Sequence, residues 1–122
     1  MKIEVGDVVY INLNPTKGQE KNKTRPCIIL QNQITPLKLV TVLPITVDTG
    51  RRNDVFFVPI RYYREVGLNK PSVIDCYQVR TVSIDRISEN KLGNAVELIE
   101  GVLVCLNVLN RVIQLIEEGV LE

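Results

Sequence analysis

The pattern of apolar and polar residues predicts mostly short strands in this chain of 122 residues. Short runs either alternate between apolar and polar residues or are apolar throughout, as half-buried and fully buried strands do. Stretches rich in Gly, Pro, Asn and Asp separate the runs and are typical of turns. We predict five or six strands, over residues 5–13, 25–31, 38–46, 54–60 and 72–82, with a turn or bulge at 77–80 in the last range. Pro44 predicts an edge or a bulge, because proline has no N–H to donate.

The period changes to that of a helix near residue 94. Asn94 followed by Glu97 is a variant of the capping box, and apolar residues then recur at spacings of three and four. That spacing predicts one continuous apolar stripe facing a core. Gly119 is expected to end the helix. Val104 and Val108 lie on the otherwise polar side, so a second interface there is the less favoured alternative.

Strands followed by one helix predict an α+β fold, a small β-barrel with a C-terminal helix, in a single domain over residues 1–122. Hydrophobic residues make up 45% and charged residues 24%, an ordinary globular balance. We expect no membrane contact, since no apolar run reaches transmembrane length and the first residues lack a signal-peptide core. Cys27, Cys76 and Cys105 form no CxxC pair and indicate free thiols in a reducing cytoplasm.

The residue inventory excludes several kinds of catalytic site. The chain has no histidine, so a Ser-His-Asp triad and a Cys-His dyad are absent. Neither GxxxxGK[ST] nor GxGxxG occurs, and no metal or cofactor is expected. The net charge is +1, but residues 1–91 hold 14 Lys or Arg against 9 Asp or Glu. A basic body can present one positive face to a phosphate backbone, although scattered solvated charge is an equal alternative.

A polar, basic loop leads directly into an apolar strand in the stretch NPTKGQEKNKTRPCIIL, residues 14–30. At the junction stands Arg25, followed by Pro26. Arginine presents a planar fork of donors that suits phosphate oxygens and stays charged at any working pH. Placed where a phosphoryl group gains negative charge, it stabilises a transition state without a metal. Its alternative role is to pair with a carboxylate at a strand end.

Three blocks of the sequence resemble the MazF/PemK family of toxin endoribonucleases. They are GDVVYINLNPTKGQEKNKTRPCIIL at 6–30, VLPIT at 42–46 and SVIDCYQVRTV at 72–82, so the resemblance covers essentially the whole chain. It implies an SH3-like β-barrel with a C-terminal helix, assembled as a homodimer. It also implies metal-independent cleavage of single-stranded RNA within a short sequence, leaving a 2′,3′-cyclic phosphate and a 5′-hydroxyl. A cognate antitoxin would lay an extended segment and a helix across the dimer's RNA groove.

The family's motifs imply roles for individual residues. Arg25 is the implied principal catalytic group, which stabilises the charge of the pentacovalent intermediate. Thr46, in the PIT block, would hydrogen-bond the scissile phosphate or orient the 2′-hydroxyl, and Glu20 would accept the 2′-hydroxyl proton. Substrate binding is implied for the basic loop and the third block, at Lys17, Gly18, Lys21, Lys23, Tyr77, Gln78 and Arg80. For the lysines the alternative is a solvated loop, and for the last two residues it is holding Arg25 or a bulge in place.

Two departures from the family pattern affect the predicted chemistry. The loop reads GQEK where the family usually has GSEQ, and Tyr77 stands where the family commonly has an acidic residue. Catalysis would then depend on Glu20, or on Asp75 from a shifted register, while Tyr77 could stack on a base. Two other classes of function remain open. One is a binder of the gyrase-poisoning CcdB type, although IEEGVLE does not resemble the end of its helix. The other is a plain interaction module.

Overall fold

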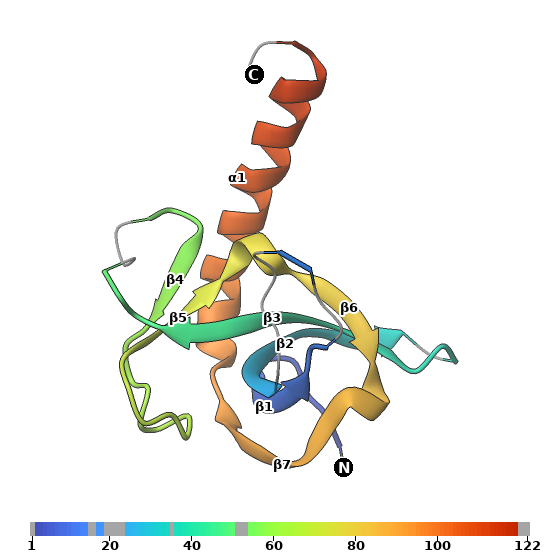
Figure 1. The fold of residues 1–122 in the computed structure, drawn as a ribbon, viewed down its shortest axis with the longest axis vertical. Coiled ribbons are helices and arrows are strands. Elements are labelled where there is room, and N and C mark those ends of the chain that lie inside the picture. Colours follow the sequence, from blue (N-terminus) through green and yellow to red (C-terminus); the bar gives the residue numbers. More distant parts are fainter. Residues whose placement is uncertain (1, 15–16, 19–23, 35, 51–53, 120–122) are drawn as a thin grey trace.

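The chain folds into a strongly curved antiparallel sheet that continues into a long helix (Figure 1). The computed structural model describes residues 2–14, 17–18, 24–34, 36–50 and 54–119. Its elements are β1 (Asp7–Asn12), β2 (Thr24–Ile34), β3 (Leu39–Val47), β4 (Phe57–Ile60), β5 (Ser72–Asp75), η1 (Cys76–Gln78), β6 (Arg80–Ser83), η2 (Ile84–Arg86), β7 (Ile87–Asn94), η3 (Val96–Leu98) and α1 (Ile99–Glu117).

The strands follow the order β4-β5-β3-β2-β1-β7, and β6 also pairs with β3. Both faces of the central strands are covered. On one face a cluster that includes Val9, Cys27 and Val82 lies between β1, β2, β3 and β6. On the other face a cluster that includes Ile28 and Leu43 packs against the first turns of α1. Two covered faces explain why the sequence of these strands is nearly continuous in apolar residues.

Strand β3 changes its neighbours along its length. On one edge residues 39–44 pair with β2, with two shifts of register, and on the other edge residues 39–42 pair with β6. From Ile45 onward β3 pairs with β5. Pro44, which the sequence predicted at an edge or bulge, is the last residue of the ladder with β2 and the last before the ladder with β5. A residue without an N–H is tolerated where backbone pairing changes.

The predicted strands are confirmed with shifted ends, and one further strand was missed. β7 has the sequence ISENKLGN, which lacks a regular alternation of apolar and polar residues. It pairs with β1 through a ladder with two irregularities, between Val8 and Val9 and between Val9 and Ile11. These bulges let polar residues occupy a strand without facing a core.

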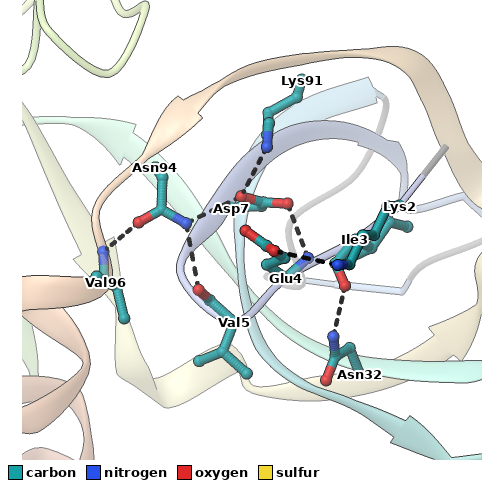
Figure 2. A network of polar contacts seen from close by, with 9 residues as sticks. All are labelled: Lys2, Ile3, Glu4, Val5, Asp7, Asn32, Lys91, Asn94 and Val96. Carbon is teal, nitrogen blue, oxygen red and sulfur yellow. Dashed lines mark hydrogen bonds and ion pairs between the residues drawn. The ribbon is translucent and has the colours of Figure 1, made fainter.

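A network of polar contacts joins β1, β7 and the start of the chain (Figure 2). The carboxylate of Asp7, which is 1% exposed, accepts the Glu4 backbone N–H at 2.8 Å and the Asn94 side-chain amide at 2.9 Å. It also forms an ion pair with Lys91 at 3.4 Å. Asn94 was predicted to cap the helix, and its Oδ1 accepts the Val96 N–H at 2.9 Å. That bond closes a turn immediately before η3, whose N-cap is Ala95, so Asn94 does not cap α1, which begins about one turn later than the sequence indicated.

The position of Gly6, immediately before Asp7, accommodates only glycine. Its φ is +88°, a conformation that residues with a side chain rarely adopt. A Cβ atom there would lie 2.5 Å from the Cα of Val96. The Gly6 N–H donates to the carbonyl of Ile29, and the Ala95 N–H donates to the carbonyl of Gly6. The Gly-Asp pair of the first block is therefore an anchor between the chain start and the segment before α1.

The prediction that the helix presents one continuous stripe to a core is wrong for its second half. Only Val102 and Cys105 of α1 are buried, and the helix extends beyond the sheet (Figure 1). Large apolar side chains that stay exposed are Leu103, Val104, Val108, Ile113 and Ile116. Spacing predicts an apolar face but not whether this chain covers it. Gly119 ends the helix as predicted: its φ is +75°, and its N–H donates a hydrogen bond to the carbonyl of Ile116.

Residues 96–117 also have the length and composition of a membrane-spanning helix, with a mean hydropathy of 1.6. The expectation that no apolar segment reaches that length is therefore wrong by this criterion. One such helix is weak evidence for a membrane span, and here its first turns pack on the sheet through Val102 and Cys105.

Candidate active site

A cavity of about 280 Å³ contains the two residues implied as the main catalytic groups, Arg25 and Thr46. Its walls come from β1, β2, β3, the loop before β5 and the start of β5. The lining residues are Tyr10, Arg25, Pro26, Ile45, Thr46, Val47, Leu68, Asn69, Lys70 and Ser72. Residues from four parts of the sequence thus meet at one hollow.

The strand register brings Arg25 and Thr46 together. Cys27 pairs with Pro44 in the ladder between β2 and β3. Arg25 lies two residues before Cys27 and Thr46 two residues after Pro44, so the direction of the two strands leads both residues to the same side of the sheet end. The ladder with β2 ends at Pro44, and on its opposite edge β3 pairs with β5 from Ile45 onward. The cavity lies where the two strands stop pairing.

The thiol nearest to Arg25 is not a nucleophile. Cys27 is fully buried, and its Sγ lies 3.6 Å from the Arg25 carbonyl oxygen. Burial raises the pKa of the Cys27 thiol to about 12, although Arg80 and Arg25 act in the opposite direction. The thiol therefore stays neutral at working pH, since the thiolate is the reactive form. The groups that the cavity offers for chemistry are the guanidinium of Arg25 and the hydroxyl of Thr46, both from half-buried residues.

Tyr77 and Gln78 lie in η1, outside the set of residues that lines this cavity. Asp75 is buried and caps η1: it accepts the Tyr77 N–H at 3.0 Å and the Gln78 side-chain amide at 3.1 Å. The alternative that Asp75 replaces the missing acidic residue as a base has no support in this geometry. The Tyr77 ring, half exposed, packs against Phe56 at a centroid distance of 4.6 Å. Burial, with Asp54 and Asp75 nearby, raises the pKa of the Tyr77 phenol.

Arg80, for which substrate binding stays a prediction, contacts the backbone of the chain. Its guanidinium donates to the Leu13 carbonyl at 3.2 Å. Arg86 donates to the Asn12 carbonyl at 3.1 Å and also to the Asn14 carbonyl. Two arginines therefore hold the carbonyls at the end of β1, where the basic loop begins. This geometry favours the alternative that Arg80 positions its neighbours.

The predicted loop residues divide into two groups. Lys17 and Gly18 are exposed, and Gly18 has φ +58° with open space around it, as expected for the predicted turn. Glu20, Lys21 and Lys23 lie outside the described residues. Their roles as base and substrate contacts stay predictions.

Four polar residues of the cavity, Tyr10, Asn69, Lys70 and Ser72, were not predicted as site residues from the sequence. Tyr10 is in the first block, where its outward position on the strand was visible: it is exposed, between buried Val9 and Ile11. Lys70 precedes Ser72, which pairs with Val47 next to Thr46. Only the pairing of β3 with β5 brings these segments together, and no spacing in the sequence encodes it.

A larger cavity of about 500 Å³ is lined by Pro59, Ile60, Arg61, Tyr62, Val66, Glu97 and Leu98. It contains neither of the implied catalytic residues, so size does not identify the active site. Among the described residues, no cluster of three or more His, Cys, Asp or Glu side chains could hold a metal ion. Metal independence itself stays a prediction.

The chain matches the family of PemK-like, MazF-like toxins of type II toxin–antitoxin systems over residues 4–106. It belongs to that family. It is 34% identical over 87 residues to the endoribonuclease MazF of Staphylococcus saprophyticus, covering 69% of this chain and 71% of that protein. It is 26% identical over 93 residues to the endoribonuclease EndoA of Bacillus subtilis, covering 73% and 78%.

Solved structures of similar fold support the barrel-and-helix prediction. The crystal structure of MazF from Deinococcus radiodurans superposes with a TM-score of 0.72 at 21% identity, over 88% of this chain and 94% of that one. A mycobacterial endoribonuclease in complex with its cognate antitoxin gives 0.66 at 15% identity, over 88% and 93%. At these identities the superpositions establish the fold, and the predicted α+β class is confirmed.

Proposed function

We propose that this toxin is an endoribonuclease that cleaves single-stranded RNA within a short sequence and needs no metal ion. The observation that carries the proposal is the meeting of Arg25 and Thr46 in one cavity at the point where β2 and β3 separate. The names of the two relatives, both endoribonucleases, support the same reaction class.

In the proposed reaction, the 2′-hydroxyl oxygen attacks the adjacent phosphorus while the bond from phosphorus to the 5′ oxygen breaks. The proton of the 2′-hydroxyl passes to a base, for which Glu20 stays the predicted group, and the departing 5′ oxygen takes a proton from water. The products are a 2′,3′-cyclic phosphate and a 5′-hydroxyl. Negative charge on the phosphoryl oxygens rises in the transition state, and a fixed guanidinium lowers the energy of that state.

Arg25 acts in this scheme as an electrostatic group rather than as a proton donor. An arginine guanidinium stays charged at any working pH, so it acts as a fixed cation. Thr46 supplies a hydroxyl, which can accept a hydrogen bond from the 2′-hydroxyl or donate one to a phosphoryl oxygen. A neutral donor and a permanent cation together suit a phosphodiester whose charge increases during the reaction.

The test is cleavage of a long single-stranded RNA in EDTA by the wild type, Arg25→Ala, Thr46→Val and a control, Arg61→Ala. Loss of one donor to a developing oxyanion typically reduces kcat by about 10²–10³-fold, so we expect a loss of that order for Arg25→Ala. Arg61 is an exposed arginine at the larger cavity, and its variant should cleave like the wild type. RNA left intact by the wild type, or equal cleavage by Arg25→Ala, would refute the proposal.

We also infer that the toxin forms a homodimer. The exposed apolar side chains of α1, among them Leu103, Val104 and Val108, support an interface on this helix. Exposed apolar patches of this kind commonly mark interfaces. Val104→Asp with Val108→Asp should then yield a monomer in size-exclusion chromatography with light scattering, whereas Asn107→Asp, on the same helix, should remain dimeric. A monomeric wild type would contradict the inference.

The third part of the proposal concerns the partner and the compartment. A cognate antitoxin would bind across the RNA-binding groove and block it; support comes from the mycobacterial endoribonuclease, which is in complex with its own antitoxin. Three free cysteines suit a reducing cytoplasm. An acidic protein encoded next to this chain that co-purifies with it and stops RNA cleavage is the expected result.

A further inference from the structure

The segment before β5 brings a second cation to the cavity of Arg25 and Thr46. Lys70 lines that cavity together with its neighbour Asn69. Its side chain is exposed, whereas Arg25 is half-buried. Lys70 thus stands at the rim of the cavity and Arg25 deeper in its wall.

The backbone around Lys70 is anchored against β3. The Lys70 carbonyl accepts a hydrogen bond from the Ser72 hydroxyl at 2.8 Å, and the Pro71 carbonyl accepts one from the Asp48 N–H at 2.9 Å. Ser72 pairs with Val47 in the ladder of β3 and β5. Two residues before Lys70, the buried side chain of Leu68 packs into the core. The backbone of Lys70 is therefore held against β3 at the cavity that Thr46 also lines, while the Lys70 side chain is exposed.

The charge of the cavity favours an anion. Its lining holds two cations, Arg25 and Lys70, and no aspartate or glutamate among the described residues. Within the described part of the chain, Lys70 has no carboxylate in ion-pair range, whereas Lys91 pairs with Asp7. A lysine at the mouth of a cationic cavity is a point charge suited to a phosphate.

We propose that Lys70 binds the RNA phosphate adjacent to the scissile one. The proposal rests on the proposed ribonuclease function and extends it with a residue that positions the substrate. The rim location assigns Lys70 to the neighbouring phosphate, while the half-buried Arg25 faces the phosphate that reacts. The charge on the neighbouring phosphate does not change during cleavage. Lys70 therefore binds substrate and transition state equally, and such binding lowers KM without changing kcat.

The variants for the test are Lys70→Gln, Lys70→Arg and the control Lys38→Gln. Lys38 is an exposed lysine before the opposite end of β3 from Thr46, so its variant has the same net charge without altering the cavity. Two measurements are made on each protein. One is cleavage kinetics on a single-stranded RNA. The other is the salt dependence of binding to an uncleavable form of that RNA with a 2′-deoxy residue at the cleaved position, followed by fluorescence anisotropy.

We expect Lys70→Gln to raise KM about three- to tenfold with kcat within about twofold of the wild type, and to reduce the slope of log K against log salt by about 0.7. Lys70→Arg should retain wild-type KM, and Lys38→Gln should match the wild type in both measurements. A loss of kcat without a change in KM would overturn the proposal, and so would equal changes in Lys70→Gln and Lys38→Gln.

The binding measurement separates failure of this proposal from failure of the ribonuclease proposal. If the wild type binds the uncleavable RNA but cleaves no RNA, the ribonuclease function fails while a smaller salt slope in Lys70→Gln still supports the phosphate contact. If the wild type cleaves RNA and Arg25→Ala does not, but Lys70→Gln is indistinguishable from the wild type, only the Lys70 proposal fails. If the wild type does not bind RNA, both fail.

Discussion

Replacement of Asp7 by alanine tests whether the network in Figure 2 stabilises the fold. The buried carboxylate accepts two hydrogen bonds, from the Glu4 N–H and from the Asn94 amide, and pairs with Lys91. Hydrogen bonds to a charged group contribute roughly 1.5–3 kcal/mol each. The half-exposed Lys91 can turn to water, so its loss costs less than that of a fully buried partner.

The size of the stability loss in Asp7→Ala depends on which of the hydrogen-bonding groups still have a partner when the carboxylate is removed. The Asn94 amide still donates to the Val5 carbonyl at 3.2 Å, so its loss is partly offset. The Glu4 N–H loses its carboxylate. We therefore expect Asp7→Ala to lower the free energy of unfolding by about 3 kcal/mol, a large part of the roughly 5–15 kcal/mol typical of a domain.

The assay is urea unfolding followed by circular dichroism, at one fixed protein concentration because a dimer's stability depends on it. Glu4→Ala is the control: the Glu4 side chain makes an exposed ion pair with Lys2, at 3.8 Å, and its backbone N–H is retained. Exposed pairs contribute about 0–1 kcal/mol. If Asp7→Ala unfolds within about 0.5 kcal/mol of the Glu4→Ala variant, the network does not stabilise the fold as reasoned here.

Two further predictions concern single positions. Gly6→Ala should lower the free energy of unfolding by about 2–4 kcal/mol in the same assay. The cost arises because φ is positive at this position and because the added Cβ would lie 2.5 Å from the Cα of Val96. Gly50→Ala, with φ +99° and open space, should cost about half as much or less; equal losses would contradict the steric argument. Because the pKa of Cys27 is raised to about 12, unfolded chains lose that proton first as pH rises. Stability should therefore fall above about pH 9, by up to about 1.4 kcal/mol per pH unit for this thiol, and Cys27→Ala should show a smaller fall.

The sequence predicted the parts of the fold that follow from local chemistry. The runs that became β1, β2 and β3 are apolar enough to be recognised, and Gly119 ended the helix where a glycine was expected. β7 was missed because a strand with bulges and polar residues has no period of two. The exposed half of α1 was misassigned to a core, because an apolar stripe has the same spacing whether its own chain or a partner covers it.

The candidate site was predictable to a similar extent. Arg25 and Thr46 stand in recognisable blocks, and the structure brings them to one cavity. Lys70 could not be predicted as a site residue from the sequence, since its closeness to Thr46 depends on the pairing of β3 with β5. The side chains of Gln78 and Arg80 bond to Asp75 and to the Leu13 carbonyl, contacts that the motif did not indicate, and their role in substrate binding stays a prediction. A motif identifies which residues recur together but not which atoms they contact.

The change of partner along β3 has a consequence for how such a toxin can diversify. Arg25 and Thr46, the two proposed catalytic groups, are fixed by backbone pairing, Arg25 with Ile11 of β1 and Thr46 with Val73 of β5. The remaining walls come from separate connections, such as the one carrying Lys70. Replacing or lengthening those connections would alter which nucleotides fit while the reacting geometry stays in place, so selectivity and chemistry can be engineered separately in this scaffold.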